Sequence, residues 1–161
     1  MQRLWAPWRM EYIGGEQPPG CLFCRVLGDT GHDEENLVLA RPHEALVMLN
    51  RYPYNSGHAM VAPRAHVGTL EDLDDAQSME LMRAVRTTLG VIRRVMSPEG
   101  FNVGANIGRV AGAGIPDHVH IHIVPRWNGD TNFMPVLAEV KVINEALAQT
   151  AEKLRSAFAA T

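Results

Sequence analysis

Three histidines alternate with apolar residues in HVHIHIV, residues 118–124, in a chain that has seven histidines in all. The side-chain period of a β-strand is two, so His118, His120 and His122 are expected to share one face of a strand. A polar strand face can tolerate histidine, but it would normally carry Lys, Thr and Glu rather than one scarce residue three times. Two kinds of chemistry fit better. Alternating imidazoles can hold a metal ion, and a neutral imidazole can act as a nucleophile or acid–base group on a phosphate ester.

The segment before the histidines favours phosphate chemistry. It reads GRVAGAGIPD, residues 108–117, and contains Gly108, Gly112 and Gly114. Glycines let backbone N–H groups approach an anion closely, although many such loops are simple turns. The loop therefore supports a phosphate site only together with the histidines that follow it.

The two cysteines form a C-x-x-C pair, Cys21 and Cys24. This spacing suits a zinc half-site, a redox pair or a chance occurrence in a turn. A redox pair is disfavoured because no thioredoxin-like βαβ pattern surrounds it. A finger-like zinc site is disfavoured because no His-x₃₋₅-His pair lies nearby in sequence. In a reducing compartment the cysteines are expected as thiols or metal ligands rather than as a disulfide.

The apolar periodicity indicates which elements position these residues. Two apolar runs in NLVLARPHEALVMLN predict a hairpin around Pro42, and HAMVAP and FNVGANI predict two further strands. The stretch from Leu70 to Met96 predicts one amphipathic helix, with a buried stripe of Leu73, Ala76, Met79, Met82, Val85, Leu89, Ile92 and Met96. A final helix is expected from about Glu139 to Phe158. This order predicts an α+β domain on a largely antiparallel sheet.

Length and composition indicate one globular domain. The chain has 161 residues, of which 46% are hydrophobic and 20% are charged. A formal charge of −3 gives no support to a nucleic-acid or anionic-membrane binder. No apolar run approaches the ~18 residues of a membrane span, and MQRLWAPWRMEY does not read as a signal peptide, so a cytoplasmic protein is expected. We divide the chain into an N-terminal arm (1–20), a central domain (21–130) and a C-terminal extension with a helix (131–161).

The combined motifs resemble those of the histidine triad family. HVHIHIV matches the family pattern His-φ-His-φ-His-φ-φ, where φ is apolar, and PRWNGD follows it as the family's Pro-Arg and Gly-Asp positions do. Upstream, LNRYPYNSGHAMVAPRAH is similar to the family's Asn, Gly-His and Val-x-Pro segment, so the resemblance covers roughly residues 20–130. LWAPWR and NGDTNFMPV look most like the branch that contains diadenosine tetraphosphate phosphorylases and dinucleoside polyphosphate hydrolases.

This resemblance implies a single histidine-triad domain that performs nucleotidyl transfer in two steps. The middle histidine, His120, would attack the α-phosphorus, and water or inorganic phosphate would then release the mononucleotide. His122 would bond the phosphoryl oxygens or the leaving group, with His58 beside the phosphates. The implied substrate-binding residues are Asn50, Asn106, Gly112 and Gly114. The chain departs from many members in AGAGIPDH, which lacks their Gln, Ser or Thr, so the acceptor stays open.

The resemblance also implies a metal and a partner. Some family members bind structural zinc through a C-x-x-C pair, a histidine after the Val-x-Pro strand and the first triad histidine, which here are Cys21, Cys24, His66 and His118. Mg²⁺ can arrive with the nucleotide substrate, and a homodimer is implied. His32 and His43 match nothing in the family and are expected in loops or at the surface.

Three alternatives remain at this point. One is a nucleoside phosphoramidase of the same family. Another is a non-catalytic nucleotide-binding module, which would not need His58, His120 and His122 together. The last is a metal-dependent hydrolase that uses the triad as ligands and would lose activity reversibly with a chelator.

Overall fold

A computed structural model describes residues 20–130 and 145–161. The expected N-terminal arm therefore lies outside the described residues, apart from Gly20. The same holds for NFMPV in the branch-specific segment and for the predicted start of the last helix at Glu139.

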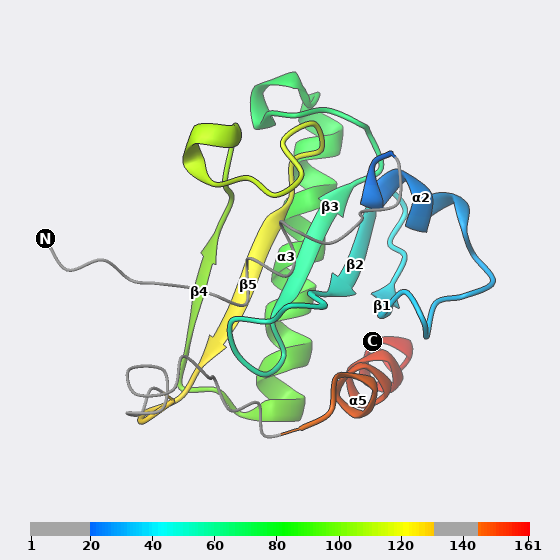
Figure 1. The fold of residues 1–161 in the computed structure, drawn as a ribbon. Helices are drawn as coiled ribbons and strands as arrows, with labels where there is room; N and C mark the ends of the chain where they lie inside the picture. The colour runs from blue at the N-terminus through cyan, green and yellow to red at the C-terminus, as the bar shows by residue number, and fades with distance from the viewer. Residues whose placement is uncertain (1–19, 131–144) are drawn as a thin grey trace, which may run out of the picture.

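The centre of the fold is a five-stranded antiparallel sheet (Figure 1). Its spatial order is β1-β2-β3-β5-β4, and each neighbouring pair runs antiparallel. The strand bounds are β1 (Val38–Ala40), β2 (Ala45–Leu49), β3 (Ala59–Pro63), β4 (Gly100–Gly104) and β5 (Ile121–Arg126). The predicted hairpin is formed by β1 and β2, and the predicted antiparallel α+β domain is confirmed.

Helices cover both faces of the sheet. Their bounds are α2 (Leu22–Gly28), α3 (Asp75–Met96) and α5 (Leu147–Ala159), with 3₁₀ turns η1 (Leu70–Asp72) and η2 (Arg109–Ala111). The long helix α3 lies across one face of the sheet, and α2 lies near the ends of β2 and β3 (Figure 1). The part of the chain that the structure describes has no helix with the length and apolar character needed to cross a membrane.

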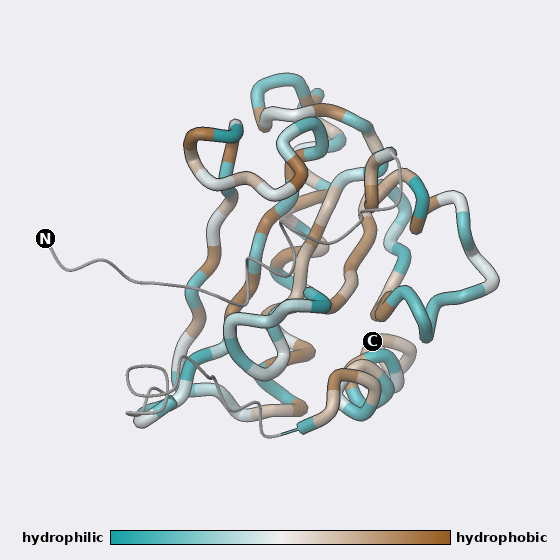
Figure 2. Tube along the Cα trace, viewed as in Figure 1, coloured by the Kyte–Doolittle hydropathy of each residue, from teal (hydrophilic) through white to brown (hydrophobic). Residues whose placement is uncertain are grey.

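Strand alternation divides the core into two clusters. Val47, Val61 and Ile121 point toward α3 and belong to the main core. Their neighbours Met48 and Met60 belong to a second cluster, which is built around Phe23 and Val26 of α2. Because both faces of the central strands are buried, these strands appear as nearly continuous apolar segments (Figure 2). The period of two therefore places the histidines that alternate with Val119, Ile121 and Ile123 on the α2 face.

The predicted long helix is present, but its start and its buried stripe were partly wrong. Residues 70–72 form η1, and α3 begins only after Asp74, which forms a capping box with Gln77. Met79 and Met82 are each 55% exposed. The buried positions of α3 are Leu81, Ala84, Val85, Thr88, Val91 and Ile92. Two apolar rows overlap in the first half of the helix, and the prediction assigned the wrong one to the buried face.

Candidate active site and metal centre

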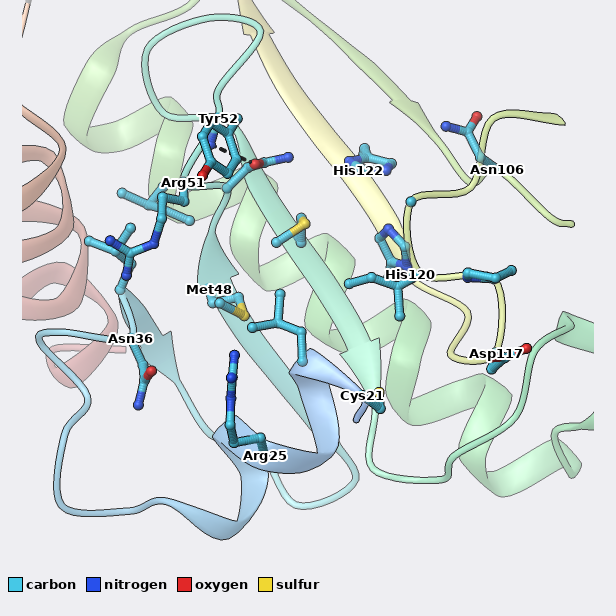
Figure 3. Close-up of a pocket in the computed structure, with 18 of the residues that line it drawn as sticks. Cys21, Arg25, Asn36, Met48, Arg51, Tyr52, Asn106, Asp117, His120 and His122 are labelled. Carbon is cyan, nitrogen blue, oxygen red and sulfur yellow. Dashed lines mark hydrogen bonds between the residues drawn. The ribbon is translucent and has the colours of Figure 1, made fainter. Parts of the chain in front are cut away.

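A cavity of about 770 Å³ opens on the α2 face of the sheet. In Figure 3, His120 and His122 lie between Asn106 and Asp117 on one side and Met48 of β2 with Arg25 of α2 on the other. Six of the predicted catalytic and substrate-binding residues line this cavity: Asn50, Asn106, Gly112, Gly114, His120 and His122. The structure therefore brings together residues that are separated by up to 72 positions in the sequence (122 − 50).

The hydrogen bond of His120 selects the tautomer of the neutral ring. β5 begins at Ile121, so His118 and His120 lie in the segment that leads into the strand. The His120 side chain is buried, with its Nδ1 2.9 Å from the His118 carbonyl oxygen. A carbonyl can only accept, so Nδ1 carries the proton and Nε2 keeps its lone pair. Burial lowers the pKa of His120 and outweighs the hydrogen bond to the His118 carbonyl, which raises it. The lowered pKa favours the neutral ring. A neutral imidazole with a fixed tautomer is a competent nucleophile.

His58 and His122 form a second chain of hydrogen bonds. The Tyr54 backbone N–H donates to His58 Nδ1 at 3.0 Å, so the proton of a neutral His58 must lie on Nε2. That Nε2–H donates to His122 Nδ1 at 3.0 Å. His122 then carries its own proton on Nε2, from which it can donate a hydrogen bond to a phosphoryl oxygen. His58 is fully buried and does not line the cavity, so its contact with the cavity wall is through His122.

A network of side chains holds the turn that contains Tyr54, Asn55 and His58 against β5. The buried Asn55 donates to the Pro125 carbonyl at 3.0 Å and to Asp130 Oδ2 at 2.8 Å. Asp130 also accepts from the guanidinium of Arg126, which raises the pKa of that arginine. Arg126 reaches Asn102 of β4 at 2.8 Å. The Pro-Arg and Gly-Asp positions were expected from the sequence motifs, whereas the contact of Asn55 in NSGH with Pro125 and Asp130 was not.

The glycine loop differs from the simple anion cradle that the sequence suggested. Gly108 and Gly112 have φ values of +81° and +85°, which a side chain would disfavour. The Gly112 N–H donates to the Arg109 carbonyl at 3.0 Å, and the Ala113 N–H donates to the Gly108 carbonyl at 3.3 Å. These two amides are therefore engaged within the loop. The positive φ values show that these glycines form the turn around η2.

Asn50 is fixed at the cavity wall by its neighbours. Its backbone N–H donates to the His58 carbonyl at 2.8 Å, and its side-chain Oδ1 accepts from the Tyr52 N–H at 2.9 Å. The first bond couples Asn50 to the turn that carries His58. The second bond orients the amide and leaves its NH₂ group to donate.

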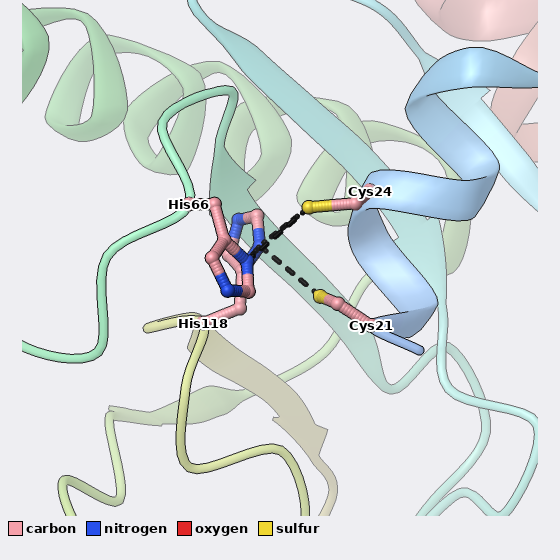
Figure 4. A group of neighbouring side chains, drawn as sticks. All are labelled: Cys21, Cys24, His66 and His118. Carbon is pink, nitrogen blue, oxygen red and sulfur yellow. Dashed lines mark hydrogen bonds between the residues drawn. The ribbon is translucent and has the colours of Figure 1, made fainter. Parts of the chain in front are cut away.

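Cys21, Cys24, His66 and His118 converge from three segments of the chain (Figure 4). Cys21 is the N-cap of α2, and Cys24 lies in its first turn. One potential ligand atom from each residue can be chosen so that all four lie within 4.8 Å of one another. His118 Nδ1 is 3.3 Å from both Cys21 Sγ and His66 Nδ1, and 3.6 Å from Cys24 Sγ. Tetrahedral zinc places its sulfur and nitrogen ligands roughly 3.3–3.8 Å apart, so these residues fit such an ion.

The hydrogen bonds around His118 also suit a metal ligand. His118 Nε2 donates to the Pro63 carbonyl at 2.8 Å, which leaves Nδ1 unprotonated and directed at the cysteines. Burial lowers the pKa of His118 and so keeps the ring neutral. Four protein ligands leave no open position, which is typical of a structural site. His32 and His43 lie elsewhere and are exposed, beside Asp29 and Glu44, as expected.

Comparison with known families identifies the class of protein. The HIT domain model matches residues 32–129, which is more than half of the chain. The chain therefore belongs to the histidine triad (HIT) family. This agrees with the fold and with the resemblance found in the sequence motifs.

Several relatives are named as enzymes that act on nucleotides. The chain is 42% identical over 169 aligned positions to an AP-4-A phosphorylase of Mycobacterium tuberculosis, covering 99% of this chain and 85% of that protein. It is 32% identical to an adenosine 5′-monophosphoramidase of Schizosaccharomyces pombe, covering 67% of this chain and 75% of that protein. It is 36% identical to an asymmetrical bis(5′-nucleosyl)-tetraphosphatase of the same yeast, covering 58% and 50%.

Solved structures share the fold. A zinc-bound histidine triad family protein from Mycobacterium smegmatis superimposes with a TM-score of 0.66 at 26% identity, covering 88% of this chain and 94% of that one. A hypothetical histidine triad nucleotide-binding protein from Sulfolobus tokodaii gives a TM-score of 0.69 at 23% identity, covering 87% of this chain and 93% of that one.

Proposed function

We propose that this protein cleaves dinucleoside polyphosphates, such as diadenosine tetraphosphate, at the α-phosphate through a covalent nucleotidyl-His120 intermediate. One observation carries the proposal: His120 is held by the His118 carbonyl as the tautomer whose Nε2 has a free lone pair at the cavity. The similarity over almost the whole chain to an enzyme that is named for a dinucleoside tetraphosphate supports the choice of substrate.

The two steps use the hydrogen bonds described above. In the first step, His120 Nε2 attacks the α-phosphorus, and the bond from phosphorus to the bridging oxygen breaks. The polyphosphate leaves as an anion, to which His122 Nε2–H donates a hydrogen bond, while His58 Nε2–H donates to His122 Nδ1 and keeps that ring in place. In the second step, an acceptor oxygen attacks the same phosphorus, the bond from phosphorus to His120 Nε2 breaks, the proton of the acceptor is released to solvent, and His120 leaves as a neutral ring. A preorganised site stabilises the spread negative charge in both steps.

The remaining predicted residues have binding roles in this proposal. The Asn50 amide would bind the ribose hydroxyls, and Asn106 and Gly114 would lie beside the phosphates, with Gly112 shaping their loop. Mg²⁺ would enter with the polyphosphate rather than bind to the free protein. The ligands Cys21 and Cys24 precede the matched residues 32–129, so we place the start of the catalytic unit at residue 21 and its end at 130.

We propose that the Cys21, Cys24, His66 and His118 set holds a structural zinc ion. The donor set of two thiols and two imidazole nitrogens is one that zinc prefers, and a zinc-bound relative shares the fold. When bound, the ion supplies a rigid tetrahedral junction between α2, the loop after β3 and the segment before β5.

The acceptor is tested by product analysis. We expect diadenosine tetraphosphate with inorganic phosphate to yield ADP and ATP in equal amounts, because the similar mycobacterial protein is named as a phosphorylase. Without phosphate, cleavage should be slower by at least about tenfold, an energy difference of roughly 1.4 kcal/mol in the barrier. Chromatography with and without phosphate is the measurement. AMP and ATP formed equally fast in both reactions would contradict phosphorolysis, and release of AMP from adenosine 5′-phosphoramidate alone would favour the phosphoramidase alternative.

We propose that the protein is a homodimer that pairs through β4. β4 is an edge strand, and Val103, Ile107 and Val110 are exposed on it or just after it. Light scattering at micromolar concentration should give twice the chain mass of 17.8 kDa. Val103→Lys should shift the protein toward the monomer without loss of helical content. A wild-type monomer at this concentration would contradict the proposal.

A further inference from the structure

Phe23 lies between the two cysteines in sequence and packs against the segment that leads into β5. Its side chain is completely buried in the cluster with Val26, Met48 and Met60. It does not line the cavity, so it is not placed to touch a substrate. The sequence analysis assigned it no role.

The Phe23 ring packs against two histidines of different function. Its centroid is 5.0 Å from that of His118, a candidate metal ligand, and 4.9 Å from that of His120, the proposed nucleophile. The interplanar angles are 50° and 45°, so neither pair is a parallel stack. These distances lie within the range of favourable aromatic contacts. One buried ring thus supports both imidazoles.

The His120 ring is held from three directions. Phe23 packs against it, His122 lies edge-on at a centroid distance of 4.8 Å, and the His118 carbonyl accepts from Nδ1. Without the Phe23 ring, a space would open in which the His120 ring could rotate. Rotation would break the bond to the His118 carbonyl and release the tautomer. The reacting nitrogen would then spend less time in line with the phosphorus.

The metal ligands determine where Phe23 can lie. Cys21 and Cys24 flank it on α2, and both contact His118. A metal ion bound by these residues would fix α2 relative to the segment that carries His118 and His120. The position of Phe23 would be fixed by the same bonds.

We propose that Phe23 is a positioning residue that couples the Cys/His metal site to the His120 ring. The inference rests on the proposed function, because His120 is its target. Loss of the Phe23 ring should lower kcat and leave KM and nucleotide affinity nearly unchanged. A displacement of a reacting group by about 1 Å can cost up to about 100-fold in rate, and we expect a 10- to 100-fold fall in kcat for Phe23→Leu.

The test compares Phe23→Leu with Val26→Ala, both in the full-length protein. Val26 is equally buried, belongs to the same cluster on α2 and serves as the control for a general loss of packing. Metal analysis should show equal zinc in both variants, and calorimetry should show equal AMP affinity. Rapid quench should show slow formation of the nucleotidyl adduct in Phe23→Leu only. Equal adduct rates in wild type and Phe23→Leu, or an equal slowing in Val26→Ala, would overturn the proposal.

A second readout does not depend on turnover. Long-range ¹H–¹⁵N NMR of histidine rings should show one tautomer for His120 in the wild type and a mixture in Phe23→Leu. If the wild type cleaves no dinucleotide, the proposed function fails, and this spectrum still decides whether Phe23 positions His120. A single, unchanged tautomer in Phe23→Leu would overturn the role of Phe23.

Discussion

His120→Ala is expected to lower the rate of dinucleoside polyphosphate cleavage by more than about 10³-fold, the scale seen when a covalent catalyst is removed from a site that keeps its other groups. The reason is that the free lone pair on His120 Nε2 supplies the bond to phosphorus, and no neighbouring group is placed to replace it in this account. Steady-state kinetics measures the loss. AMP affinity, measured by calorimetry, should stay within severalfold because Asn50 and the loop remain.

Two further variants serve as a control and as a rescue experiment for His120→Ala. His43→Ala removes an exposed histidine and should keep full activity. His120→Gly leaves a space that can admit free imidazole, which should restore part of the rate in a concentration-dependent manner. If His120→Ala kept most of its activity, the nucleophile would be misassigned. His122 would then be the next candidate, and the metal-dependent hydrolase would become the better explanation.

Removal of the metal is expected to have the largest effect on stability. We expect about one zinc ion per chain in the purified protein, and Cys21→Ser or chelation should lower the free energy of unfolding by several kcal/mol, since a metal that binds only the folded chain contributes its binding free energy to folding. For a domain of this size that loss corresponds to a fall in Tm of roughly 10 °C or more. Metal analysis and thermal unfolding measure the two quantities.

The control for this experiment is His32→Ala, which removes an exposed histidine outside the ligand set. Its Tm should stay close to that of the wild type. Native protein without zinc, in which both cysteines react readily with a thiol reagent, would contradict the structural site.

The strands could be predicted from the sequence because they depend on short-range patterns, whereas the grouping of the site residues was implied by the family resemblance. The alternation of apolar residues identified the strands and the shared face of His120 and His122. The buried face of α3 was harder to predict because Met79 and Leu81 belong to two different apolar rows of the helix. Packing of the whole helix on the sheet decides which row is buried.

The hydrogen bonds of the site could not be derived from the sequence. His58 and His122 are 64 positions apart, and their contact depends on the pairing of β3 with β5. The same applies to Asn55 and Asp130, and to the packing of Phe23 on His120. The motifs show which histidines the site contains. The tautomer of each histidine follows only from the hydrogen-bond partners that the fold brings to it.

In the proposed mechanism, His120 carries a nucleotidyl group during turnover. The most direct measurement is to quench the wild type in mid-turnover with diadenosine tetraphosphate labelled at the α-phosphate and to map the labelled peptide by mass spectrometry. We expect one acid-labile, base-stable adduct on His120, absent from His120→Ala. An adduct on another histidine, or steady turnover with no adduct at any quench time, would contradict it.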